Sequence, residues 1–262
     1  MNKTNIEYLD YTWNPICMRC DPVSEGCANC WHLRMCKRMA GNPKFKKEER
    51  AVYKGGKFLL RSEELDAPLR LKKPARIGVQ FMGDLFHEDV PFQMIRDIFR
   101  VMMKNNRHTY IILTKRPERL KKWMGVNYDP ETSHRFIKNY PNIWFGITAE
   151  NQIHADERIP VLLSIPAAKH FVSVEPMLGQ VDLEVYLQRF ACDTRDFKTN
   201  VIVPKGTRID WVIAGPETGS GARSCCTNTQ NFVNDLYWQC DAAGVPFFDK
   251  RKTVWIERRW PR

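Results

Sequence analysis

The chain has 262 residues, 43% of them hydrophobic, which is enough to bury a full core as one large domain or two smaller ones. No stretch approaches about 18 consecutive apolar residues, and the opening MNKTNIEYLDYTWNP lacks the apolar run of a secretory signal. We therefore expect neither a membrane-spanning nor an exported protein, but a cytoplasmic one. The formal net charge of +11 favours a polyanionic partner such as nucleic acid or a nucleotide.

Short apolar runs alternate with helical patterns along most of the chain. The apolar spacing predicts helices over 28–41, 91–106, 116–124, 155–165 and 229–244. Strands are predicted at 6–12, 76–84, 109–115, 143–151, 170–178, 210–219 and 245–250. Nearly continuous apolar strands between helices are typical of parallel β/α units. We therefore predict an α/β fold, a partial (β/α) barrel of about six parallel strands, with a doubly wound sheet as the alternative.

Polar side chains follow five of the predicted strands. They are Gly83-Asp84, Thr114-Lys115-Arg116, Thr148-Glu150-Asn151, Ser173-Glu175 and Gly215-Glu217. Because ligands of β/α barrels bind at the carboxyl ends of the strands, these sets predict the lining of one polar pocket. Helix N-caps are the alternative explanation for some of them, Asp84 and Ser173 among these. No strand is followed by GxGxxG or a Walker loop, the two commonest nucleotide signatures.

Five of the nine cysteines lie between Cys17 and Cys36. In a reducing compartment such a cluster indicates metal binding rather than disulfides. Cys17 and Cys20, together with Cys27 and Cys30, form two Cys-x2-Cys pairs that suit a closed zinc site. Cys20, Cys27 and Cys30 alone suit a [4Fe–4S] cluster with one open iron. The spacing leaves both open, whereas the helical period points Cys36 to the far side of its helix and predicts core burial.

The end of the chain is strongly basic. The last thirteen residues, KRKTVWIERRWPR, hold six cations, one acid and two tryptophans. Cations for phosphates and indoles for stacking predict a nucleic-acid contact, with a solvated basic tail as the alternative. We therefore predict a barrel domain over 1–250 and a basic C-terminal tail over 251–262.

Seven blocks of sequence carry a resemblance to a known family. They are TWNPICMRCDPVSEGCANCW, FMGDLFHEDVP, LTKRPERL, WFGITAENQIHADERIP, FVSVEPMLGQVDL, DWVIAGPETGSGAR and CDAAGVPFFDK. On these blocks, which cover most of the chain in order, it resembles a phage-associated radical-SAM-like family of the radical SAM superfamily. The family pattern maps onto Cys20, Cys27 and Cys30. Cys17 is additional and keeps a fourth ligand open.

The resemblance implies a [4Fe–4S] cluster held by those three cysteines in a loop after the first strand, with S-adenosyl-L-methionine (SAM) as the cofactor. It implies one-electron cleavage of SAM and abstraction of a hydrogen from the substrate, with a donor such as flavodoxin or ferredoxin. The residues expected around SAM or the substrate are Gly83, Asp84, Lys115, Glu150, Ser173, Glu175, Gly215 and Glu217. Gly219 and Gly221 are expected in a loop along the adenosine.

The expected substrate is a nucleic acid or nucleotide. Phage association suggests modification or rearrangement of a hypermodified base in phage DNA, inside an infected host cell. The second hypothesis is a non-catalytic, zinc-stabilised nucleic-acid-binding protein. It accounts for the paired cysteines and the basic tail, but not for the polar strand ends. His87 is expected to begin a helix rather than to bind a metal.

Overall fold

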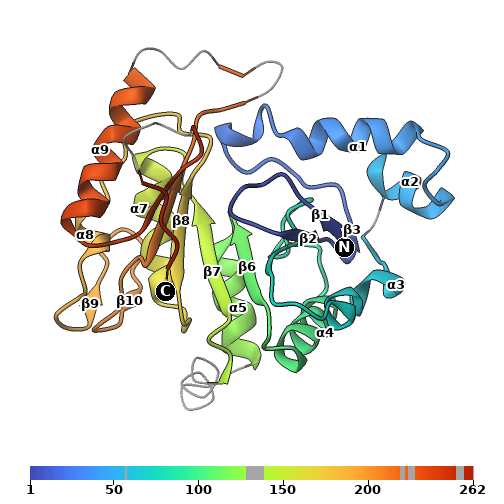
Figure 1. Ribbon diagram of the computed structural model, residues 1–262, viewed down its shortest axis with the longest axis horizontal. Coiled ribbons are helices and arrows are strands. Elements are labelled where there is room, and N and C mark those ends of the chain that lie inside the picture. Colours follow the sequence, from blue (N-terminus) through green and yellow to red (C-terminus); the bar gives the residue numbers. More distant parts are fainter. Residues whose placement is uncertain (57, 128–138, 219–221, 224–227, 252–256, 262) are drawn as a thin grey trace. The chain divides into compact units, whose positions relative to one another are not determined.

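The structure is a computed structural model that describes the whole chain except residues 57, 128–138, 219–221, 224–227, 252–256 and 262 (Figure 1). The side chains of residues 126, 127, 228 and 229 are likewise not described. The chain divides into two compact units, Met1–Thr114 and Lys115–Arg262. Among the described helices, none combines the length and the apolar character needed to cross a membrane.

The first unit is built on four strands. They are β1 (Asn2–Lys3), β2 (Tyr11–Trp13), β5 (Arg76–Val79) and β6 (Thr109–Thr114), in that spatial order. β1 is antiparallel to β2, whereas β2, β5 and β6 are parallel, with Thr12 opposite Gly78 and Gly78 opposite Ile111. Apart from the partly exposed Leu113, the apolar residues of β5 and β6 are buried, as expected for parallel strands covered on both faces.

A small antiparallel pair, β3 (Ile16–Cys17) with β4 (Leu59–Leu60), follows β2 in the chain. The helices of this unit are α1 (Trp31–Gly41), α2 (Lys47–Tyr53), α3 (Ser62–Leu65) and α4 (Phe92–Lys104), with the 3₁₀ turns η1 (Glu25–Cys27) and η2 (Ala67–Arg70). One side chain from β3 and several from α1 and α2 form a separate small core, which includes Cys17, Cys36, Met39, Val52 and Tyr53. Residues far apart in the sequence thus fix the segment that carries the cysteines.

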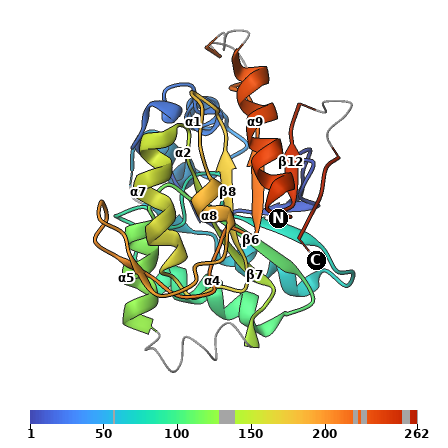
Figure 2. The same cartoon turned by 90° about the vertical axis from the view of Figure 1, so that its left-hand side faces the viewer.

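The second unit holds four parallel strands. They are β7 (Ile143–Thr148), β8 (His170–Val174), β11 (Trp211–Ala214) and β12 (Phe247–Asp249), in that order. Its helices are α5 (Pro117–Asn127), α7 (Gln152–Leu163), α8 (Glu184–Leu187) and α9 (Asn228–Ala242). Figures 1 and 2 show α7 and α9 on one side of the strands. Between α8 and β11 the chain forms a hairpin of β9 (Thr194–Arg195) and β10 (Ile202–Val203).

The predicted alternation of parallel strands and helices is confirmed. Each of the six apolar runs from residue 76 onwards contains an observed strand, and the strand predicted at 6–12 begins at Tyr11. Within the described residues of each unit, the four strands form an open set rather than a closed barrel. The coarse prediction of a parallel α/β fold therefore holds. The short pairs β3–β4 and β9–β10 were not predicted, since two-residue strands give no periodic signal.

Candidate functional site

The structure divides the five clustered cysteines into two groups. Cys17 and Cys36 are buried, 0% and 1% exposed, in the small core around Tyr53. Burial raises the pKa of the Cys17 thiol, and it raises the pKa of Cys36 to about 11. Both sulfurs point to protein groups, Cys17 to the Glu49 carbonyl at 3.8 Å and Cys36 to the His32 ring at 3.5 Å. The prediction that Cys36 lies in the core is confirmed.

Cys20, Cys27 and Cys30 form the second group, and all three are partly exposed. They lie in residues 14–30, the cysteine segment, which follows β2 and includes β3, so the expected cysteine loop does follow the first parallel strand. Cys27 ends η1, and Cys30 directly precedes α1. Two successive turns are closed by hydrogen bonds: the Cys27 N–H donates to the Ser24 carbonyl at 2.9 Å, and the Cys30 N–H donates to the Cys27 carbonyl at 3.1 Å. Among the described residues, no three His, Cys, Asp or Glu side chains already form a metal-ligand group.

The start of the cysteine segment is clamped to the loop that follows β5. Gln80 has a left-handed backbone (φ 54°), and its side chain bonds both the N–H and the carbonyl of Ile16, at 3.0 and 2.9 Å. Asn14 accepts the N–H of Met82 at 2.8 Å. A strained backbone held by several bonds is often a functional feature. Neither residue was singled out from the sequence, because a glutamine after a strand is not distinctive.

Gly83 allows the close approach of this segment. Its φ is +116°, and a Cβ there would lie 2.4 Å from the sulfur of Met18. The expected role of Gly83 was an approach to SAM, whereas the neighbour seen here is Met18. Asp84 is buried, and its carboxylate accepts the Phe86 N–H and the Thr114 hydroxyl, at 2.9 and 2.7 Å. Asp84 therefore orders the loop after β5, while helix α4 begins only at Phe92.

His87 links the same loop to the cysteine segment. Its buried ring accepts the Asp89 N–H at Nδ1, 3.2 Å away, so a neutral ring carries its proton on Nε2. Nε2 lies 3.2 Å from the carboxylate of Asp21, the residue after Cys20. The expectation that His87 begins a helix is wrong, because it lies in a loop before α4. Sequence reasoning missed this contact, since its partner is 66 residues away.

In the second unit, the predicted polar residues share one face of the strands. The register places Thr148 beside Ser173, Ser173 beside Ile213 and Ile213 beside Phe248. Because side chains alternate between faces, Glu175, Gly215 and Lys250, each two residues further on, lie on that face as well. The opposite face of β7, β8 and β11 is buried and, apart from His170, apolar, as expected for a face covered by helices. The register thus places Ser173, Glu175 and Gly215 on one face at the ends of two neighbouring strands.

Glu150 is the centre of a buried charge cluster beyond β7. Its side chain is 0% exposed and forms ion pairs with Lys115 and, at 2.8 Å, with Arg158 of α7. Arg158 also donates to the Thr148 carbonyl at 2.7 Å. Lys115 and Glu150 were both predicted at the site, and the structure joins them directly. Arg158 was missed, since it lies inside a helix where an arginine normally faces solvent.

Ser173 is 1% exposed, and no described group hydrogen-bonds its hydroxyl. A buried hydroxyl without a partner costs about 1–3 kcal/mol, so such a group marks a place where a ligand would gain a hydrogen bond. Beside it, Glu175 forms an ion pair with Lys250. The alkyl chain of Lys250 packs over Gly215, where a Cβ would lie 3.2 Å from it. These residues form a polar patch at the carboxyl ends of β8, β11 and β12.

Glu217 lies three residues beyond the end of β11. Its carboxylate, 5% exposed, accepts two bonds from the guanidinium of Arg223, at 3.0 and 2.7 Å. Such a bidentate pair fixes the loop geometry at its two ends. Gly219 and Gly221, expected along the adenosine, lie outside the described residues, as do Cys225 and Cys226.

Part of the basic C-terminal segment packs against the second unit. The guanidinium of Arg258 stacks over Phe248, 4.8 Å from the ring centre, and the Trp260 ring lies 5.1 Å from the same ring. The N–H of Arg259 donates to the Phe247 carbonyl at 2.9 Å, and its side chain pairs with Asp241 at 2.8 Å. Arg258 and Arg259 therefore have protein partners, which weakens the prediction that they contact nucleic acid.

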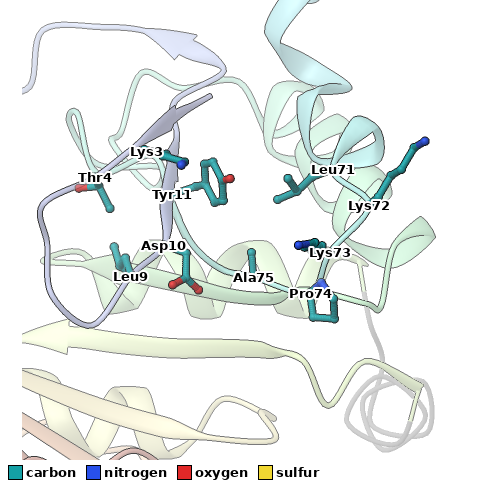
Figure 3. Close-up of a pocket in the computed structure, with 10 residues that line it drawn as sticks. All are labelled: Lys3, Thr4, Leu9, Asp10, Tyr11, Leu71, Lys72, Lys73, Pro74 and Ala75. Atoms are coloured by element: carbon teal, nitrogen blue, oxygen red, sulfur yellow. The ribbon is translucent and has the colours of Figure 1, made fainter.

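A depression of about 600 Å³ lies elsewhere in the first unit (Figure 3). It is lined by the amino ends of β2 and β5, including Asp10 and Ala75, and by three lysines, Lys3, Lys72 and Lys73. Asp10 is paired with Arg76 at 3.1 Å, which holds the pKa of that carboxyl below its usual value. Ligands of parallel α/β proteins bind at the opposite, carboxyl ends. We therefore assign the depression no part in the candidate site.

These features define a parallel α/β protein with a cysteine segment after its first parallel strand and polar groups at its strand ends. The chain matches the model of the family described as "Protein of unknown function (DUF5131)" over residues 3–261, and it belongs to that family. No curated protein and no solved structure matches it.

Proposed function

We propose that this chain is a radical SAM enzyme that holds a [4Fe–4S] cluster through Cys20, Cys27 and Cys30. The separation of the cysteines is the observation that carries the proposal. Three partly exposed thiols lie on one segment, while Cys17 and Cys36 are buried with protein partners. Three ligands would leave the fourth iron open to a cofactor. The seven sequence blocks that resemble the radical-SAM-like family support the same assignment.

The donor set fits this group in chemistry and in place. Thiolates are the usual ligands of iron–sulfur clusters, and this segment is anchored by Gln80 and Asn14 to the loop after a parallel strand. The thiols would have to converge on binding, since the described residues form no ready ligand group. When bound, the cluster and SAM would supply one-electron cleavage of SAM and hydrogen abstraction from the substrate.

The second unit has polar groups of its own that would bind a cofactor or substrate. The Ser173 hydroxyl, which no described group bonds, can donate or accept, and the Glu175–Lys250 pair lies on the same face. The Lys115–Glu150–Arg158 cluster would fix the neighbouring strand end. The substrate class we propose is a nucleic acid or nucleotide, on the basis of the net charge of +11 and the family resemblance. A base of phage DNA is one member of that class.

A zinc-stabilised binding protein is the competing function. A four-thiolate site needs Cys17, which is 0% exposed and packed beside Tyr53 and Glu49. Such a site would have to draw Cys17 out of the core. The burial of this one residue favours the three-cysteine site.

Metal analysis of anaerobically purified and reconstituted protein tests the proposal. We expect about four irons per chain and an EPR signal of the reduced protein that shifts when SAM is added. Cys17→Ala should keep the iron, and Cys27→Ala should lose it. One tightly held zinc that is lost in both variants would overturn the proposal and support the zinc site.

A further inference from the structure

The hairpin β9–β10 of the second unit carries the most exposed large apolar side chain among the described residues. Phe197, in the loop between the two strands, is 97% exposed, whereas the next most exposed ones, Val185 and Ile153, are 69% and 65% exposed. In Figure 1 the hairpin lies beside α8, at the edge of its unit. A phenylalanine that remains in water lacks the roughly 1.5–3 kcal/mol of stabilisation that its burial would contribute, and it does not pack against the rest of the fold.

The loop that presents Phe197 is held by several internal hydrogen bonds. The Asp196 carboxylate accepts the N–H groups of Lys198 and Thr199, at 3.1 and 2.7 Å, and the Thr199 hydroxyl at 2.7 Å. The Asp196 N–H donates to the Val201 carbonyl at 2.9 Å. Asn200 takes a left-handed backbone, φ 56°, which a short turn requires. The backbone that carries the aromatic ring is therefore held in place, and little loop entropy would be lost on binding.

The chain segment that forms the hairpin carries more cations than acids. Between residues 189 and 208 the chain has five cations and two aspartates, and both aspartates accept backbone N–H groups of the hairpin. Arg195 and Lys198 lie within two residues of Phe197 in the sequence and are exposed, and Lys205, just after β10, is exposed as well. Lys198 pairs with Asp156 of α7, yet its side chain remains 66% exposed. An exposed aromatic side chain with cations nearby in the sequence is a combination in which the ring stacks on bases and the cations contact phosphates.

We propose that the β9–β10 hairpin binds single-stranded nucleic acid, with Phe197 stacked on an unpaired base and the flanking cations near the phosphates. A lipid surface would call for more apolar area than Phe197 and the half-exposed Ile202 provide. An apolar protein surface would gain nothing from the excess of cations. The inference goes beyond the proposed function, because nucleic-acid binding by the hairpin needs no iron–sulfur cluster. It is tested by measuring binding affinity rather than enzyme activity.

Fluorescence anisotropy with a labelled oligo(dT) tests this inference. A length of about 20 nucleotides exceeds the roughly 4–16 of typical single-strand sites. We expect Phe197→Ala to weaken binding about tenfold or more, because stacking on one base is usually worth about that factor. Phe197→Trp should retain the affinity. The matched controls Ile153→Ala and Val185→Ala remove exposed apolar side chains of α7 and α8 that are not part of the hairpin, and they should change nothing.

The dependence on salt separates stacking from charge. Phe197→Ala removes no charge, so the slope of log K against log salt, from about 50 to about 200 mM, should stay unchanged. Lys205→Ala should reduce that slope by about one. A blunt duplex of the same length should be insensitive to Phe197→Ala. The inference is overturned if Phe197→Ala binds oligo(dT) as well as the unchanged chain, if it weakens duplex binding equally, or if the unchanged chain binds no oligonucleotide at low salt.

Discussion

His87 and Asp21 join the loop after β5 to the cysteine segment by one contact of 3.2 Å. The histidine side chain is 3% exposed, whereas the aspartate is 73% exposed, so a fixed ring holds a carboxylate that otherwise faces solvent. The Phe58 ring lies 5.0 Å from the imidazole on another side. Since Asp21 follows Cys20 directly, we expect His87 to act as a positioning residue for the first of the three proposed ligands.

Two substitutions of His87 separate its two bonds. A glutamine places its amide N–H near the position of Nε2 and so keeps the hydrogen bond to Asp21. An asparagine places its amide oxygen near the position of Nδ1, so it keeps only the bond from the Asp89 N–H. We expect His87→Gln to bind iron nearly as the unchanged chain does. His87→Asn should lose about tenfold in affinity, the lower end for outer-shell partners of a metal site. Iron retained against a chelator series measures this, and equal losses in both variants would show that the ring acts only by filling space.

The sequence predicted the parts of this site that depend on local patterns. Strand ends at Ser173 and Glu175 share a face because apolar runs fix the register, and Lys115 and Glu150 meet because both follow such runs. The sequence did not predict Gln80, Arg158 or the His87–Asp21 contact. Each of these depends on a partner in another element, for which neither spacing nor composition gives a signal. The exposed Phe197 was missed for a related reason, because two-residue strands leave no periodicity.

The buried ion cluster should be important for stability. Glu150→Gln removes the negative charge between Lys115 and Arg158, whose side chains are 16% and 8% exposed. The two mostly buried cations would then lose the carboxylate that they share, and we expect the free energy of unfolding to fall by about 3–5 kcal/mol. Urea denaturation measures the change.

The matched control for Glu150→Gln is Glu63→Gln, which breaks the exposed pair between Lys46 and Glu63, where both side chains are more than half exposed. We expect no measurable change there, since solvent screens such a pair. Equal effects of the two substitutions would contradict the assigned importance of burial.

Gly83→Ala tests the close approach of the cysteine segment. The backbone at φ +116° disfavours any side chain, and the new Cβ would also meet the Met18 sulfur. Gly206 has a positive φ of +80°, but no atom lies within 4 Å of the place that a Cβ would take, so Gly206→Ala carries the backbone cost alone. We expect a loss of about 1–3 kcal/mol at Gly206 and a larger loss at Gly83. Adding Met18→Ala to Gly83→Ala should recover the difference, and failure to recover it would show that Met18 is not the obstacle.

The stability of the fold should fall in mild acid because of buried neutral histidines. His170 is buried in β8 with Nε2 2.8 Å from the Ile165 carbonyl, and burial holds its pKa below the ordinary 6.5. Below about pH 6.5 the unfolded chain therefore binds a proton at His170 while the folded chain does not. The contribution of the neutral His170 to the free energy of unfolding is fully present above that pH, and it is lost as the pH falls toward the folded pKa. His170→Gln keeps a donor for Ile165 and does not titrate. The stability advantage of the unchanged chain over this variant should shrink by about 1.4 kcal/mol per pH unit within that window. Urea denaturation at several pH values from about 7.5 to about 5 measures it, and parallel curves for the two proteins would exclude His170 as the titrating group.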